Sequence, residues 1–175
     1  NNTQRRIEVW SIDISNETIA LQGSEVLNTS WDGDLVAFSN NVWVSNIYLG
    51  LTKIDVSDPT NPGTIIYNEV TGGDGLDVAM YDGSLYVADG TVSGAGSLGI
   101  VNVTDPTNLT SGTSIPLSSG CSADRLEVAE GYLWYVCDDI FGRYDSPFSA
   151  NNAFKNNVTL ISDVGVSGTM AYVTD

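Results

Sequence analysis

The sequence contains an internal repeat made of two alternating phrases, and this repeat restricts the possible fold more than any other feature. The first phrase reads GLTKIDVSDPTNP at residues 50–62 and SLGIVNVTDPTN at residues 97–108. In both copies apolar and polar residues alternate over the last four residues before an Asp-Pro turn signal, which predicts a β-strand that ends in a turn. With two weaker copies included, strands of this kind are expected near residues 5–15, 50–58, 97–105 and 141–147.

The second phrase has the pattern of a β-hairpin, in which two alternating apolar segments flank a turn rich in Asn, Gly or Ser. Its four copies are DLVAFSNNVWVS, LDVAMYDGSLYVAD, LEVAEGYLWYVCD and DVGVSGTMAYVTD, at residues 34–45, 76–89, 126–138 and 163–175. Aromatic residues stand at corresponding places in the second strands, and these residues are Trp43, Tyr86, Tyr135 and Tyr172. The pattern predicts strands that are buried on at least one face.

Together the phrases define a unit of about 44 residues, which consists of a hairpin, a third strand and a polar crossing to the next hairpin. A unit of this length that contains only strands is typical of a β-propeller blade, which has up to four strands. No segment of the chain combines a helical period with helix caps. We therefore expect an all-β fold, with one domain over residues 1–175 that forms a four-bladed β-propeller.

The order of the phrases predicts how the last blade is completed. A first-phrase strand at residues 5–15 precedes every hairpin, and the hairpin at residues 163–175 follows every such strand. The early strand can close the ring of its own chain, or pair with the hairpin of a neighbouring subunit and build a polymer; alternatively, the chain is half of a protein with about eight blades. Closure within one chain is the preferred prediction, because it removes sheet edges without a partner.

The residues DVA and LYVAD of the second phrase, with GLTKIDVSDPTNP of the first, resemble the LVIVD-repeat family of β-propeller surface proteins. The resemblance covers most of the chain and is clearest in the two middle units. It implies a propeller architecture and an extracellular or cell-surface location. Because the activity of this family is unassigned, the resemblance implies no particular chemistry.

Charge and composition exclude several classes of function. The chain has 22 Asp and Glu but only 6 Lys and Arg, which gives a net charge of −16. Such a surface repels phosphate backbones, so nucleic acid is not an expected partner; it attracts divalent cations or cationic partners, or simply keeps the protein soluble. The absence of histidine excludes Ser-His-Asp and Cys-His catalysis and His-ligated zinc. No apolar run has the length of a membrane span.

Cysteines and glycosylation sequons indicate an oxidising, extracellular compartment. Cys121 and Cys137 are the only cysteines and form no CxxC pattern, which favours a disulfide over a metal knuckle, with two buried thiols as the alternative. Asn-x-Ser/Thr sequons without a central Pro occur at Asn1, Asn16, Asn28, Asn102, Asn108 and Asn157. The set predicts a glycoprotein.

Acidic residues of the hairpins are the candidates for a cation site. The residues before the common Val of each hairpin are Leu35, Asp77, Glu127 and Asp163. The three acids form a candidate Ca²⁺ site, because Ca²⁺ prefers oxygen ligands. The simpler interpretation is that each Asp accepts hydrogen bonds from turn or strand-end amides. Asp58 and Asp105, each followed by Pro, are likewise expected to start turns.

Tryptophans are the candidates for a sugar-stacking surface. The chain has Trp10, Trp31, Trp43 and Trp134, each in or beside a strand phrase. Large aromatic residues supply much of the buried area in such cores. We therefore expect them to pack between blades, with Trp31 the best candidate for exposure.

The features combine into three functional hypotheses. The leading one is a non-catalytic extracellular glycoprotein module that serves as a structural, adhesive or scaffolding unit, including a subunit of a self-assembling surface filament. It requires no cofactor, and its expected partners are other copies of itself, cell-surface proteins or glycans. The alternatives are a calcium-dependent ligand-binding propeller and a glycan hydrolase that uses two carboxylates roughly 5–10 Å apart.

Overall fold

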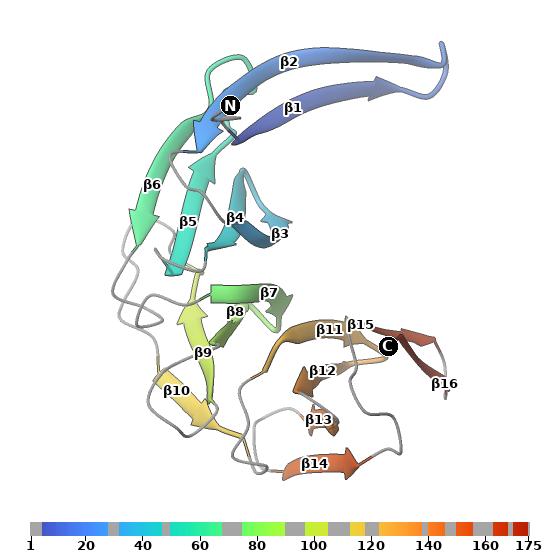
Figure 1. Ribbon diagram of the computed structural model, residues 1–175. Coiled ribbons are helices and arrows are strands. Elements are labelled where there is room, and N and C mark those ends of the chain that lie inside the picture. Colours follow the sequence, from blue (N-terminus) through green and yellow to red (C-terminus); the bar gives the residue numbers. More distant parts are fainter. Residues whose placement is uncertain are drawn as a thin grey trace.

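The computed structural model describes residues 5–27, 32–46, 50–67, 75–89, 97–104, 113–117, 123–137, 140–145, 150–155, 163–167 and 170–174. Within these ranges the chain forms the strands β1–β16 and no helix, and the strands form five antiparallel sheets (Figure 1). The all-β prediction is therefore confirmed.

Three sheets are four-stranded meanders, in which each strand pairs with the next along the chain. Sheet I consists of β3 (Asp32–Phe38), β4 (Asn41–Asn46), β5 (Gly50–Asp55) and β6 (Gly63–Tyr67). Sheet II consists of β7 (Gly75–Tyr81), β8 (Ser84–Asp89), β9 (Ser97–Asn102) and β10 (Thr113–Pro116). Sheet III consists of β11 (Arg125–Ala129), β12 (Tyr132–Cys137), β13 (Ile140–Asp145) and β14 (Ala150–Lys155). Two sheets have two strands: hairpin N consists of β1 (Arg5–Asp13) and β2 (Thr18–Leu27), and hairpin C of β15 (Asp163–Ser167) and β16 (Met170–Thr174).

Tight turns set the register within the sheets. Asp82 and Gly83 connect β7 to β8 with φ angles of 44° and 73°, and Glu130 and Gly131 connect β11 to β12 with φ angles of 54° and 77°. Positive φ at both turn positions matches the twist of the flanking strands, and Gly adopts it without strain. Because the turns are fixed, residues at equal distance from them stand at the same level of each sheet.

The strands of the first phrase end in one recurring side-chain turn. The backbone N–H two residues later donates to the side chain of Asp13, Asp55 or Asn102, at 3.0, 2.9 and 3.0 Å. Such turns stop a strand and redirect the chain. The N–H of Thr60 also donates to Asp58 Oδ1 at 3.0 Å, so Asp58 starts a turn as predicted. Asp105 lies outside the described residues.

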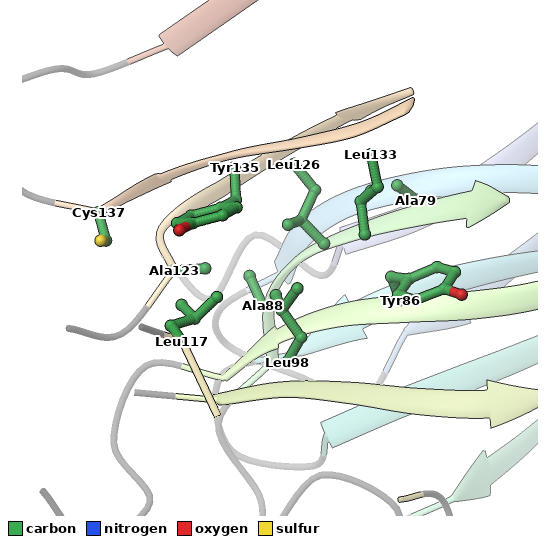
Figure 2. Packing of buried hydrophobic residues seen from close by; sticks show 10 residues of the cluster. All are labelled: Ala79, Tyr86, Ala88, Leu98, Leu117, Ala123, Leu126, Leu133, Tyr135 and Cys137. Carbon is green, nitrogen blue, oxygen red and sulfur yellow. The ribbon is translucent and has the colours of Figure 1, made fainter. Parts of the chain in front are cut away.

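The sheets pack face to face in chain order, with their first strands next to one another. β7 lies beside β3, β11 beside β7, and β15 beside β11. Trp43 of sheet I shares a buried cluster with Val87 of sheet II. Tyr86, on the opposite face of sheet II, shares a second cluster with Leu133 of sheet III (Figure 2). We call the face that packs on the preceding sheet the backward face, and the one that packs on the following sheet the forward face.

Hairpin N packs on the backward face of sheet I. Leu27 shares a buried cluster with Ile54 of β5, and the partly buried Ile7 packs against this cluster. Gly23 of β2 lies so near the chain after β5 that an added Cβ would collide with the Pro59 carbonyl oxygen. Since β1 carries the same phrase as β5 and β9, hairpin N stands where the third and fourth strands of a preceding sheet would stand.

The pairing of β1 differs from the prediction that this strand completes the last blade of its own chain. β1 pairs with β2, from Arg5 opposite Leu27 to Asp13 opposite Thr18, whereas β16 pairs with β15 in a separate sheet. Hairpins N and C lie well apart in Figure 1. Residues 18–27, where a polar crossing was expected, form a fourth strand that pairs with one edge of β1.

Candidate functional site

Asp77 joins sheets II and III. Its side chain is 2% exposed. Oδ1 accepts the N–H of Val78 and Oδ2 accepts the N–H of Leu126 on β11, both at 2.7 Å. Tyr81 makes a second connection, since its hydroxyl donates to the carbonyl of Gly131 at 2.6 Å. For Asp77 the geometry is that of the simpler interpretation, in which the carboxylate accepts strand amides.

The environment of Asp77 changes its acidity. Burial raises the pKa of Asp77 to about 7, because it disfavours the charged form. The two amide hydrogen bonds and the Arg125 guanidinium oppose this rise in pKa, whereas the Asp34 carboxylate adds to it. The carboxyl group of Asp77 therefore changes its protonation state near neutral pH.

The turn register gives Asp77 different neighbours from those expected. Four residues before the last paired residue of each first strand, the same level is occupied by Asp34, Asp77, Arg125 and Asp163. Glu127 stands two residues nearer its turn, opposite Trp134, and Leu35 one residue nearer. The difference arises because sheet III has two residues fewer between the common Val and the turn. For the same reason Trp134, and not Tyr135, stands level with Trp43 and Tyr86.

The register does not assemble the predicted cation site from described side chains. Within the described part of the chain no group of three His, Cys, Asp or Glu is placed to hold a metal ion. The carboxylate oxygens of Asp77 already accept amides, and Arg125 brings a positive charge to the same level. For Asp163 the structure describes the backbone alone.

The covalent sites are described in part. Cys137 is disulfide-bonded, and Cys121, which lies outside the described residues, is the only other cysteine of the chain. Asn16, in the turn of hairpin N, and Asn102, at the end of β9, are both exposed. The remaining sequons, at Asn1, Asn28, Asn108 and Asn157, lie outside the described residues.

One face of hairpin N is apolar and exposed. Trp10 pairs with Leu21, and Ile12 pairs with Ile19, so their side chains share a face. With Ile14 they form a surface that we call the distal face; its exposed fractions are 49% for Trp10 and Leu21, 70% for Ile12, 66% for Ile19 and 86% for Ile14. The sequence analysis expected Trp10 to pack between blades. In the structure it does not pack between sheets of this chain. Trp43 does, with 1% exposed, and Trp31 lies outside the described residues.

The forward face of sheet III carries a half-buried aromatic cluster. The Trp134 ring stacks on Phe141 with centroids 4.9 Å apart and 5° between the planes. The Arg143 guanidinium lies 4.2 Å from the Tyr132 ring centroid and 5.6 Å from that of Trp134. In sheet I the residue level with Trp134 is Trp43, which is fully covered by sheet II. Hairpin C therefore leaves the forward face of sheet III only partly covered.

A groove of about 410 Å³ separates hairpin N from the first two strands of sheet I. Arg6, Ile7 and Leu27 line one side, and Gly33, Asp34, Leu35 and Val44 line the other. Leu35 is 51% exposed, whereas Val78 and Leu126, at the same level, are 3% and 7% exposed because a preceding sheet covers them. The groove is thus the place that the first two strands of a preceding sheet would fill.

The distal face and the groove were not found by sequence reasoning. The alternating segment TIALQGSEVL at residues 18–27 was the signal for a fourth strand. Exposure of its apolar residues has no sequence signal, because it depends on which sheet lies next to the hairpin.

Comparison with known proteins assigns no family. No protein-family model matches the chain, and no curated protein matches it. Among the described residues there is no helix long and apolar enough to cross a membrane.

Proposed function

We propose that this chain is a non-catalytic structural subunit of an extracellular or cell-surface assembly, built as a four-bladed β-propeller whose last blade is shared between copies. Hairpin C supplies the first two strands of that blade, and hairpin N of another copy supplies the third and fourth. One observation carries the proposal: the two hairpins have complementary positions in a four-stranded sheet, yet they lie apart in one chain.

Several features support an extracellular location and a structural role. Cys137 is in a disulfide, which persists in oxidising compartments. Asn16 and Asn102 stand exposed in sequons, where a glycan has room. The resemblance to LVIVD-repeat surface proteins belongs to the same proposal.

The two alternatives have less support. A glycan hydrolase needs a pair of acids beside a substrate cleft, and the buried acid Asp77 is occupied by two amides. A calcium site at this level has to accommodate Arg125. We therefore favour the structural role.

Sedimentation velocity over a wide concentration range, combined with electron microscopy, tests the proposal. The expected result is a mass that rises with concentration and particles larger than one chain. Ile12→Glu places a charge on the distal face and is expected to leave a folded monomer. Phe38→Glu is the matched control, because Phe38 is 42% exposed but lies outside the distal face and the groove lining. A parent chain that stays monomeric at every concentration contradicts the proposal.

A further inference from the structure

We infer that the groove between hairpin N and sheet I binds hairpin C of a second copy, with β16 of that copy antiparallel to β1. The inference rests on the proposed function and specifies its contacts. One interface then has two parts, in which hairpin C of the first copy covers sheet I of the second, and hairpin N of the second copy covers sheet III of the first.

The first part follows from the packing of neighbouring sheets. β7 covers part of β3, β11 covers part of β7, and β15 lies beside β11. The backward faces of β7 and β11 are thus covered by the first strand of the preceding sheet. The backward face of β3 borders the groove instead. Leu35 and Val44 face it from sheet I, and Ile7 and Leu27 close it from hairpin N. A two-stranded hairpin that follows β11 in the same series has the strand order and strand direction to fill it.

The pairing register can be derived from sheet I. Asn41 of β4 stands opposite Asp55 of β5, which ends in the same side-chain turn as Asp13. At equal distance from the hairpin turn, Met170 occupies the position of Asn41. β16 and β1 therefore pair with Met170 opposite Asp13, which sets Val173 opposite Trp10 and Thr174 opposite Val9.

The same comparison tells which side chains come closest. The N–H of Val56 donates to the Asn40 carbonyl at 2.8 Å, so Asn40 and Val56 form a hydrogen-bonded pair. Pairs alternate along an antiparallel ladder, so the position of Ser45 opposite Leu51 is a non-hydrogen-bonded pair, where side chains approach more closely. Thr174 and Val9 occupy that position in the shared blade.

The second part explains the distal face. Between sheets I and II, Trp43 packs in one cluster with Val101 of β9 and Val103 just after β9. Counted from the side-chain turn, Ile12 of β1 and Ile14 just after β1 stand at the positions of Val101 and Val103. Their partner is accordingly the forward face of sheet III in the other copy, where the half-buried Trp134 and Phe141 are stacked. Both incompletely covered apolar surfaces are buried by one contact.

Disulfide trapping between two single-cysteine variants tests this register. Val9→Cys and Thr174→Cys are mixed, assembled and oxidised, and the products are separated without reductant and identified by peptide mass spectrometry. The expected product is a reducible dimer joined between these positions. Val9→Cys mixed with Val173→Cys is the matched control, because adjacent strand residues point to opposite faces; we expect at least about tenfold less of its dimer.

The outcomes separate this inference from the proposed function. Assembly by sedimentation without the Val9–Thr174 cross-link, or with an equal yield from the control, overturns the inferred register while the assembly function stands. A double variant carrying Val9→Cys and Thr174→Cys that forms only an intrachain bond overturns the exchange between copies, because it shows closure within one chain. A parent that does not assemble contradicts both.

Discussion

Sheet II and hairpin N each contain a strand of the first phrase, but the two strands differ in what covers them. In sheet II, Val101 of the first-phrase strand is completely buried between sheets I and II. In hairpin N, Ile12 stands at the same distance from the strand-ending turn and is 70% exposed. The difference teaches that burial in this chain is decided by the adjacent sheet, and that the exposed apolar residues of β1 lie where no described sheet covers them.

The largest effect is expected when one aromatic residue is truncated in each region, which tests the difference in coverage between sheet II and hairpin N. Tyr86 is 1% exposed between sheets II and III, so Tyr86→Ala is expected to lower the free energy of unfolding by about 3–5 kcal/mol. Trp10 is half exposed, so Trp10→Ala in dilute solution is expected to cost less than about 1 kcal/mol and yet to weaken assembly. Urea denaturation measures the first quantity and sedimentation the second. Equal losses of stability in the two variants contradict the difference in coverage.

A smaller effect on stability is expected from two acids at the same level of their sheets. Asp77 is buried between sheets II and III, and Asp34 lines the groove. Because the pKa of Asp77 is raised from 3.8 to about 7 by burial, the folded state holds a proton that the unfolded state has released. Stability is therefore expected to fall as pH rises from about 4 to 7, by on the order of 1–3 kcal/mol. Asp77→Asn is expected to flatten this slope in urea denaturation series at several pH values.

The control for this pH dependence is Asp34→Asn. Asp34 accepts the N–H of the next residue, as Asp77 does, but is exposed. This variant is expected to keep most of the slope between pH 4 and 7. The pKa of Asp13, lowered to about 2 by its hydrogen bonds to Ser15 and Asn16, acts in the opposite sense and only below about pH 4. A parent without any slope between pH 4 and 7 contradicts the raised pKa of Asp77.

Much of the fold was predictable because it is encoded locally. The hairpins and third strands follow from alternation and turn residues, such as Asp82-Gly83 and Asp58-Pro59. The residue of sheet III at the level of Asp77 was misassigned as Glu127, because sheet III has two fewer residues before its turn and Arg125 therefore stands in line with Asp77. The groove and the distal face could not be predicted, since their exposure reflects the position of neighbouring sheets.

Amide hydrogen exchange in β1 and β16, measured at low and high protein concentration, tests the central claim of a shared blade most directly. In the separate hairpins each of these strands has one neighbour, so half of its amides point to an open sheet edge. The account predicts that exchange slows in both strands together as the mass rises, while strands of sheet II change little. A rise in mass without slower exchange in β1 and β16 would contradict it.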